Sequence, residues 1–382
     1  MKRSTGRILT THVGALPGPP EVWENPDENP ARLGDEVAAV VRAQRDAGID
    51  LVNEGELTKG GNWVTFINKR LAGFEERPLR TSRALLMGSK DWREFDDFYA
   101  AAIAGGTLFE QTRAAPNQAR RCDHVCTAPI VYTGREALQR EIETLRAALG
   151  DLDVGDAFLT STAPASIEAG RLNEYYRSEE EYVYAIAEAL RTEYEAIAAA
   201  GFVVQIDDAW LAALWDRIGV QMGLEAYESF CMMRVEALNH ALRNVPVEQV
   251  RYHLCWGSWH GPHAYDIPLS DIVDVMLSVK AQAYLFEAAN VRHEHEYRVW
   301  ETVKLPAGKI LAPGVVSHAT ALIEHPDLVS ERIQRFARLV GAENVIASTD
   351  CGLGLRCHPQ IAWAKLKALS EGARRASAAL WP

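Results

Sequence analysis

Short apolar runs alternate with stretches of helical periodicity along most of the chain. Eight of these runs are expected to be strands, and they are centred near residues 8, 51, 159, 204, 253, 285, 312 and 347. Several are continuously apolar, which is typical of parallel strands that are buried on both faces. Strands that alternate with helices predict a parallel sheet, and eight such units predict a (β/α)8 barrel. A doubly wound open sheet is the alternative, and it would gather functional groups at one crevice.

The segments between these strands carry the apolar spacing of amphipathic helices. Helices are expected at residues 35–47, 135–149, 178–200, 224–242, 272–279, 328–340 and 361–378. The third is expected to begin at Ser178, because a glutamate follows three positions later, as in a capping box. Residues 57–150 are irregular and contain several Trp and Phe residues. We interpret them as an insertion after the second strand, with a hairpin, inside a single barrel domain that spans residues 1–382.

The chain is acidic overall, with a formal net charge of −12 at pH 7. This charge argues against a nucleic-acid groove or an anionic membrane surface as the partner. No run of 18 apolar residues occurs and no apolar signal core follows the first residues, so we expect a soluble, cytoplasmic protein. Six cysteines in 382 residues are too few for a disulfide scaffold and are better explained as ligands, nucleophiles or core residues. The oligomeric state stays open, with a homo-oligomer among the alternatives.

A His-x-Cys pair closes the fifth expected strand. Side chains alternate along a strand, so His253 and Cys255 point to the same side. Glu287 closes the next strand and Cys351 closes the last one. The C-terminal ends of barrel strands meet at one face, so we expect these four side chains to bind a single Zn²⁺. The competing interpretation is that the cysteines are inert core residues and that hydrogen bonds satisfy the histidine.

The expected ligand set indicates a type of chemistry. Its members are spread along the chain from residue 253 to residue 351, whereas structural zinc sites have close local spacing, so a catalytic site is favoured. Two thiolates and a carboxylate make the ion electron-rich and poor at activating water. Such a site suits an incoming thiol, whose pKa of about 8.5 falls on coordination, so that the thiol is held as a reactive thiolate. The thiol would most readily displace Glu287. The predicted reaction is alkyl transfer to sulfur, with a small thiol and an alkyl donor as the partners.

Five further residues are candidates at the mouth of the barrel. Glu56 and Asp207 close two strands and would bind a cationic amine or orient the substrate, and Asp207 is also a candidate catalytic group. A salt bridge or a helix cap is the alternative for both. His12 is a candidate substrate ligand, with a hydrogen-bonded structural role as the alternative, and His318 is a candidate general acid. Trp256 would line the substrate pocket, unless it serves only in packing.

Two other groupings have the residue types of metal sites, and their roles stay open. His293 and His295 form a His-x-His pattern, which on a loop is more often solvated or ion-paired. Cys122 and Cys126, with His124 between them, are candidates for a second metal site inside the irregular region.

Seven short motifs, taken together, resemble the catalytic barrel of cobalamin-independent methionine synthase over nearly the whole chain. They are Thr10–Pro17, Gly55–Glu56, Gln205–Asp207, His253–Cys255, Phe286–Ala288, Pro313–Val315 and Asp350–Leu353. The resemblance implies a TIM barrel of the type shared with uroporphyrinogen decarboxylase, which has no such zinc. It also implies that the four predicted ligands bind zinc and that Glu56 and Asp207 face the amino-acid thiol, which is homocysteine in that enzyme.

The chain departs from the methionine synthase pattern at three places. Ala15 stands where that enzyme has a serine, the fourth-strand motif reads Asp207-Asp208-Ala209, and His318 falls one position early. We also expect the N-terminal half of the full-length enzyme, which helps to hold folate, to be absent. Neither folate nor homocysteine is therefore fixed as a substrate.

Residues 253–296 are most similar to proteins grouped with epoxyalkane:coenzyme M transferase, in which a zinc-bound thiolate opens an epoxide. Methyl transfer to homocysteine or a related thiol and epoxide opening by a thiol are therefore both open. Two other classes compete with a zinc-dependent thiol alkyltransferase: a metal-free lyase like the decarboxylase, and a non-catalytic zinc- or thiol-binding protein. Strand ends rich in acids and thiols argue against the lyase, which would need cationic residues for an acidic tetrapyrrole.

Overall fold

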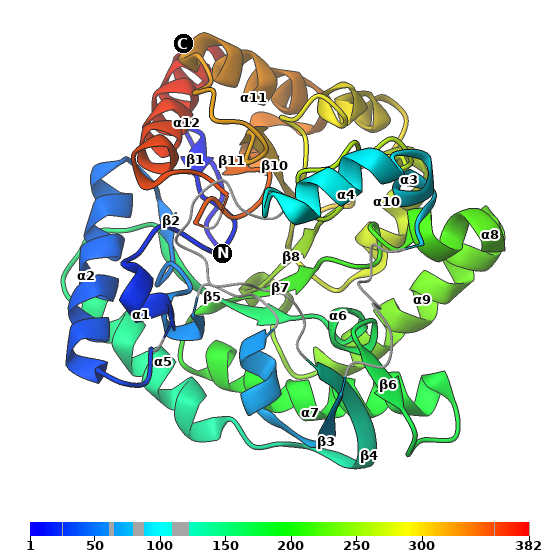
Figure 1. Cartoon of the computed structure of the whole chain (residues 1–382). Helices are drawn as coiled ribbons and strands as arrows, with labels where there is room; N and C mark the ends of the chain where they lie inside the picture. The colour runs from blue at the N-terminus through cyan, green and yellow to red at the C-terminus, as the bar shows by residue number, and fades with distance from the viewer. Residues whose placement is uncertain (25, 61–64, 79–87, 109–121, 355, 382) are drawn as a thin grey trace.

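Eight parallel strands form a barrel at the centre of the molecule, in the order β1-β11-β10-β9-β8-β7-β5-β2 (Figure 1). The computed structural model describes residues 1–24, 26–60, 65–78, 88–108, 122–354 and 356–381. The strands are β1 Leu9–Thr10, β2 Leu51–Val52, β5 Asp156–Thr162, β7 Val203–Asp208, β8 Val250–Leu254, β9 Ala283–Phe286, β10 Ile310–Val316 and β11 Ile346–Thr349. Each lies at or next to a predicted strand centre. The predicted (β/α)8 barrel is confirmed, and the open doubly wound sheet is wrong.

The barrel closes where β1 meets β2. The backbone N–H of Asp50 donates to the carbonyl of Thr10 (3.1 Å), and the Thr11 hydroxyl donates to the carbonyl of Leu51 (3.2 Å). The Asp50 carboxylate also accepts a hydrogen bond from the backbone N–H of Thr10 (2.9 Å). Each of the two strands is only two residues long. Side chains therefore hold this seam as much as the backbone does.

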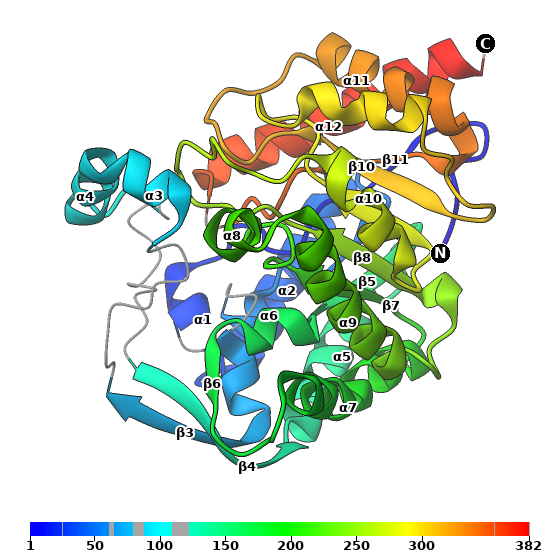
Figure 2. The ribbon, with the colours of Figure 1, turned by 90° about the vertical axis from the view of Figure 1, so that its right-hand side faces the viewer.

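Helices surround the barrel and bury their apolar faces against the strands (Figures 1 and 2). The longer ones are α2 Pro30–Asp46, α5 Arg135–Leu149, α7 Glu179–Ala199, α9 Leu224–Ala241, α10 Leu269–Ser278, α11 Pro326–Val340 and α12 Pro359–Leu380. All seven correspond to predicted helices. Ser178 caps α7, because its hydroxyl accepts the N–H of Glu181 (3.1 Å). None of the helices in the described ranges is long and apolar enough to span a bilayer.

Shorter helical segments connect these elements. The α-helical ones are α1 Pro20–Glu24, α3 Lys90–Glu94, α4 Asp96–Ala104, α6 Pro164–Glu168 and α8 Val220–Met222. The 3-10 turns are η1 Leu57–Lys59, η2 Thr65–Lys69, η4 Val247–Gln249, η5 Glu294–Glu301 and η6 Ala342–Asn344, and η3 Trp215–Gly219 is a π-helical turn. α3 and α4 pack over the loop that follows β8, where the Trp259 indole N–H donates to the Tyr99 hydroxyl (3.2 Å).

A second, three-stranded sheet lies outside the barrel. β3 (Leu71–Pro78) and β4 (Cys122–Tyr132) are antiparallel, and the short β6 (Arg171–Asn173) joins β4 in parallel. Figure 2 shows β3 and β4 on the outer side of the molecule, away from the eight-stranded sheet. We call β3 and β4 the arm. That residues 57–150 form one insertion inside a single domain stays a prediction, and α5, within that range, belongs to the ring of helices around the barrel.

Arg251, on β8, crosses the interior of the barrel. Its guanidinium donates to the Gln205 side-chain oxygen (2.7 Å), the Thr11 hydroxyl (2.9 Å) and the carbonyl of His12 (2.6 Å). It also lies over the Phe158 ring, 3.7 Å from the centroid. Burial lowers the pKa of Arg251 to about 9, so the side chain stays cationic at neutral pH. β8 and β1 lie on opposite sides of the ring in the strand order, so Arg251 ties two opposite strands together.

Candidate metal centre

Three of the four predicted ligands meet at the C-terminal face of the barrel. His253 is in β8, Cys255 follows that strand directly, and Cys351 follows β11. One ligand atom from each lies within 4.8 Å of the others. The two sulfur atoms are 3.9 Å apart. Residues almost 100 positions apart in the sequence, at the ends of two strands, thus share one small volume at the barrel mouth, where (β/α)8 barrels carry their active sites.

Glu287, the fourth predicted ligand, lies beside Cys255. It follows β9, and its Oε1 atom is 3.9 Å from the Cys255 sulfur. The same oxygen accepts the backbone N–H of Trp256 (3.2 Å), and Oε2 accepts the Asn290 side-chain amide (2.7 Å). The carboxylate is therefore held at the edge of the cluster, where it can complete a ligand set or give way to another donor.

The orientation of His253 suits a metal ligand. Its Nδ1 atom lies 3.0 Å from an Asp207 carboxylate oxygen, and its buried Nε2 atom has no hydrogen-bond partner within the described residues. A carboxylate on one ring nitrogen is the arrangement that orients a histidine whose other nitrogen binds a metal. Burial opposes the charged form of His253, but the hydrogen bond to Asp207 and the Cys351 charge raise its pKa above the ordinary value. An unpartnered imidazole nitrogen beside two sulfur atoms fits the borderline-soft donor set that Zn²⁺ prefers.

The cluster retains protons that a cation would replace. The hydrogen bond between the two thiols raises the pKa of Cys255 well above its usual range and, against the effect of burial, lowers that of Cys351 to about 6. Burial raises the pKa of Glu287 to about 8, and the nearby Asp350 and Cys351 charges add to this. Metal ligands must be deprotonated, so binding of a divalent cation here would release these protons.

Asp350 and Asn290 support the cluster, and the sequence interpretation missed both as site residues. Asp350 Oδ1 accepts the backbone N–H groups of Ala288 and Ala289 (2.8 Å each), and Oδ2 accepts the Asn290 amide (3.2 Å). These bonds hold the start of the loop that carries Glu287. The position of Asp350 directly before Cys351 was the available signal, whereas the contacts of Asn290 depend on the path of a loop.

Glu56 and Asp207 form an acidic pair near the cluster. Glu56 has a left-handed backbone (φ 57°), which is uncommon outside glycine. Burial raises the pKa of Glu56 to about 8, and the Asp207 charge raises it further, against a hydrogen bond with Thr160 that lowers it. Glu56 therefore holds a proton at neutral pH. Asp207 Oδ1 also accepts the Gln205 side-chain amide (2.7 Å), so one oxygen contacts both Gln205 and His253.

The remaining predicted site residues have different surroundings. His12 bonds through Nε2 to Gln44 of α2 (2.8 Å) and packs against Phe158, and burial lowers its pKa to about 4. This is the structural alternative for His12, and contact with substrate stays a prediction. Trp256 is fully buried, and its indole N–H donates to the carbonyl of Ile267 (2.8 Å). This buried position is the packing alternative for Trp256, and its place in the wall of the substrate pocket stays a prediction.

His318 follows β10 and lies beside the carboxylates. One of its nitrogens, a Glu287 oxygen and an Asp350 oxygen are all within 4.8 Å of one another. Burial lowers the pKa of His318 well below its usual range, and the charge of Arg356 lowers it further. His318 is therefore neutral at physiological pH. It could act as the predicted general acid only through the N–H of the neutral imidazole.

The His293 segment is ion-paired. His293 lies 2.7 Å from Glu296 through Nδ1 and 3.3 Å from Asp266 through Nε2, and Asp266 also bonds to His263 (3.1 Å). His293 therefore takes the ion-paired alternative rather than a ligand role, while His295 is exposed. These contacts join the loop after β8 to the loop after β9.

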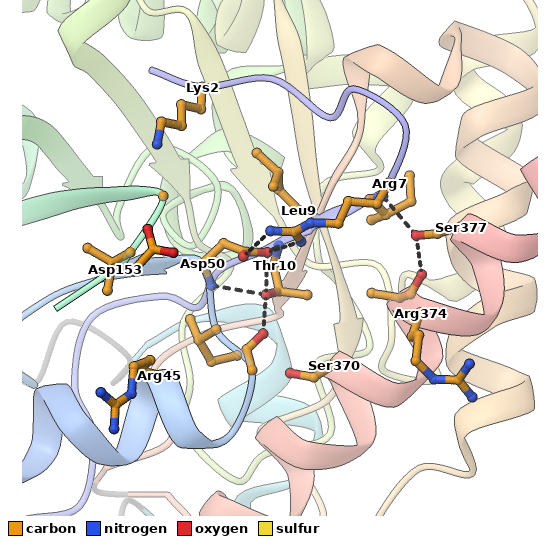
Figure 3. Close-up of a pocket in the computed structure, with 16 residues that line it drawn as sticks. Lys2, Arg7, Leu9, Thr10, Arg45, Asp50, Asp153, Ser370, Arg374 and Ser377 are labelled. Atoms are coloured by element: carbon orange, nitrogen blue, oxygen red, sulfur yellow. Dashed lines mark hydrogen bonds and ion pairs between the residues drawn. The ribbon is translucent and has the colours of Figure 1, made fainter. Parts of the chain in front are cut away.

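A hollow of about 540 Å³ opens at the other end of the barrel (Figure 3). Asp50 and Gly155, which directly precede β2 and β5, Thr10 of β1 and Ser377 of α12 are among the residues that line it. In Figure 3 the Arg7 guanidinium reaches the Asp50 carboxylate, with distances of 2.6 and 2.8 Å. This end of a (β/α)8 barrel carries stabilising contacts rather than catalytic groups. The C-terminal face is therefore the expected place for catalytic groups.

The His253, Cys255 and Cys351 cluster lies at the C-terminal face, where (β/α)8 barrel enzymes carry their active sites. The chain belongs to the cobalamin-independent synthase family, whose catalytic-domain profile matches residues 97–375. It is thus an enzyme of this family.

Relatives and solved structures agree with this assignment. The chain is 24% identical to the 2-hydroxypropyl-CoM lyase of Xanthobacter autotrophicus, over 96% of this chain and 94% of the relative. It is 23% identical to the methionine synthase of Thermococcus kodakarensis, over 96% of this chain and 92% of the relative. A B12-independent methionine synthase from Shewanella sp. W3-18-1, solved with selenomethionine, has the same fold: its TM-score is 0.69 at 16% identity, covering 98% of this chain and 99% of that one.

Proposed function

We propose that the protein transfers a methyl or other small alkyl group to the sulfur of a small thiol at the C-terminal face of the barrel. The observation that carries the proposal is the cluster of His253, Cys255 and Cys351, in which His253 Nε2 has no hydrogen-bond partner within the described part of the chain. His253 and Cys255 are buried and Cys351 is half-buried. These residues and Glu287 would hold Zn²⁺, which supplies the positive charge that keeps a bound thiol as a thiolate near neutral pH.

The surrounding residues have roles that follow from their contacts. Asp207 fixes the ring orientation of His253, and the Asp350–Asn290 pair positions the Glu287 carboxylate. His253, Cys255 and Glu287 are buried, which limits the access of water that would compete with the thiol as a nucleophile. Packing of α3 and α4 over the loop after β8 adds to this exclusion.

The transfer itself requires one proton at the leaving group. The thiolate sulfur uses an electron pair to form the new carbon–sulfur bond while the bond from that carbon to its leaving atom breaks. The leaving atom keeps the electron pair of the broken bond and takes up a proton. Glu56 holds a proton at neutral pH and is assigned as its source, since His318 is neutral and a weaker acid.

Two substrate pairs fit this chemistry. Methyl transfer to homocysteine is supported by the family and by the relatives that are methionine synthases. Opening of a short epoxide by a small thiol is supported by the relative named 2-hydroxypropyl-CoM lyase and by Ala15, which offers no hydroxyl for an amino-acid substrate. Ala15 lies against the loop after Cys351, because its carbonyl accepts the N–H groups of Leu353 (3.0 Å) and Gly354 (2.8 Å).

The two pairs can be tested side by side on one zinc-loaded preparation. Methylated folate with homocysteine and a short epoxide with coenzyme M are each offered, and alkylated thiol is measured by mass spectrometry. We expect one pair to react and Cys351→Ser to abolish the product. X-ray absorption at the zinc edge should show an added sulfur at ~2.3 Å only with the accepted thiol. Zinc that binds no thiol, together with no product from either pair, would contradict the proposal and leave a non-catalytic zinc-binding protein.

The compartment that we assign to the protein is the reducing cytoplasm, which keeps thiols free.

A further inference from the structure

A second group of metal-type ligands lies on the arm. Glu76 of β3 and Cys122 and His124 of β4 each offer a ligand atom, and these three atoms lie within 4.8 Å of one another. The arm is on the outer side of the molecule, away from the eight-stranded sheet (Figure 2). We propose that Glu76, Cys122 and His124 form a second site for a divalent transition-metal ion, with Zn²⁺ as the preferred occupant, that ties β3 to β4.

Strand register places the three side chains on one face. Cys122 and His124 are two residues apart on β4, so they project to the same side. Glu76 is the direct antiparallel partner of His124, and Cys122 pairs with Pro78 at the last position of the ladder. Directly opposed side chains of an antiparallel pair lie on the same face. The ligands therefore come from both strands, and an ion between them would join the strands where the ladder ends.

The spacing and exposure suit a metal ion. The Cys122 sulfur lies 3.9 Å from His124 Nε2. A sulfur and a nitrogen bound to one tetrahedral zinc are separated by about 3.6 Å, from bond lengths of about 2.3 and 2.0–2.1 Å. Cys122 and His124 are half-buried and Glu76 is exposed, so an ion can enter from solvent. A thiolate, an imidazole and a carboxylate leave a fourth position for water and favour Zn²⁺ over Mg²⁺ or Ca²⁺.

A neighbouring amide holds the histidine in the form that a metal needs. The Asn68 side-chain oxygen accepts a hydrogen bond from Arg171, so the Asn68 NH₂ group faces His124 Nε2, 3.0 Å away. Nε2 must therefore be the unprotonated, accepting nitrogen of a neutral ring. A metal binds this unprotonated form, and an ion at Nε2 would take the place of the Asn68 N–H at that lone pair.

Cys126 provides the matched control on the same strand. It lies four residues after Cys122, is fully buried, and directs its thiol to the carbonyl of Ala128 (3.4 Å). The sequence left open a site made by Cys122 and Cys126, whereas the structure groups Cys122 with Glu76 and His124. The proposal therefore predicts that Cys122 binds the ion and that Cys126, on the same strand, does not.

The test counts zinc ions on the full-length chain. With zinc as the only added metal, we expect wild type to bind two ions, Cys122→Ser and His124→Ala to bind one, and Cys126→Ser to bind two. Alkyl transfer by Cys122→Ser should equal that of wild type. In the Cys255→Ser/Cys351→Ser background, Co²⁺ should give a thiolate charge-transfer band that disappears when Cys122→Ser is added.

A milder variant guards against misfolding. Glu76 is exposed, so Glu76→Gln should fold normally and weaken zinc binding at this site on the order of 10-fold. A chromophoric chelator in competition would measure this affinity. If wild type, Cys122→Ser and Glu76→Gln bind the same number of zinc ions with the same affinities, the arm has no metal site. That result would leave the barrel cluster and the proposed transfer untouched.

Discussion

The Glu56 carboxylate fills the space that a side chain on Gly14 would need. A Cβ atom on Gly14 would lie 2.1 Å from Glu56 Oε1, and Gly14 itself has a left-handed backbone (φ 45°). The residue that holds a proton at the barrel mouth is thus in van der Waals contact with the turn that follows β1. Both residues belong to the short motifs that carry the family resemblance, and the contact gives a physical reason for the glycine.

Gly14→Ala should displace Glu56. We expect kcat/KM to fall on the order of 100-fold, because a small misplacement of a catalytic group has effects of that size. Steady-state kinetics with the accepted thiol would measure the loss. Gly34→Ala is the control, since a Cβ at Gly34 meets nothing within 4 Å. A Gly14→Ala enzyme with wild-type kcat/KM would show that the position of Glu56 does not matter.

Glu56→Gln should be less active than wild type, and at high pH it should be more stable. With a pKa of about 8 in the folded chain and an ordinary value near 4.5 when unfolded, Glu56 carries a proton in the folded state only, between those pH values. The folded state then binds more protons, so wild-type stability falls as pH rises through this window. The variant should be more stable than wild type above pH 8, on the order of 1–3 kcal/mol, and nearly equal to it below pH 4.5.

Urea unfolding at pH 4.5, 7 and 9 would measure this difference, with the exposed Glu225→Gln as control. Wild-type activity should also decline above pH 8, where Glu56 loses its proton. An unchanged pH dependence in Glu56→Gln would rule out this carboxyl as the proton source.

Removal of the barrel metal should abolish activity. Cys255→Ser and Cys351→Ser should each lose one zinc ion per chain and reduce activity more than about 1000-fold, because each removes an anionic ligand. Elemental analysis and the transfer assay measure the two effects together, and added zinc should restore chelator-treated wild type. Cys231→Ser, at a buried core cysteine of α9, should keep the metal. Full activity in a preparation free of metal would exclude a role for zinc.

Asp350→Asn should weaken the centre without unfolding the barrel. Asp350 accepts three N–H donors, and an amide in its place would turn an NH₂ group toward at least one of them. The Glu287 loop should then move, with a loss of zinc affinity on the order of 10–100-fold. Chelator competition measures the affinity, and the exposed Asp274→Asn serves as control. If the affinity is unchanged while kcat falls, Asp350 acts on substrate and not through Glu287.

Arg251→Met should destabilise the barrel. The change leaves the Gln205 oxygen, the Thr11 hydroxyl and the His12 carbonyl without a buried donor, at a cost of about 1–3 kcal/mol for each group left unsatisfied. The free energy of unfolding in urea measures this cost, and the exposed Arg298→Met should be nearly neutral. A cost below about 1 kcal/mol would mean that solvent reaches these groups.

The barrel was predictable because its signal is carried by buried strands. Runs such as Ala283–Phe286 are apolar on both faces, and their ends mark where chemistry collects, which is why His253, Cys255 and Cys351 were found together. β6 was not predicted, because Arg171–Asn173 is a half-buried, three-residue strand without alternation. Glu76 was missed as a partner of Cys122 and His124, because strand pairing across the arm is not encoded in local spacing.

The tie that Arg251 makes between β8 and β1 has a consequence for how such a protein can diversify. It braces the ring from within, below the mouth, so the shape of the frame does not rest on the segments that border the substrate. The loops at the mouth can then lengthen, shorten or be exchanged without loss of the barrel. New substrate preferences can accordingly arise by exchange of the loops at the C-terminal face while the barrel itself stays unchanged.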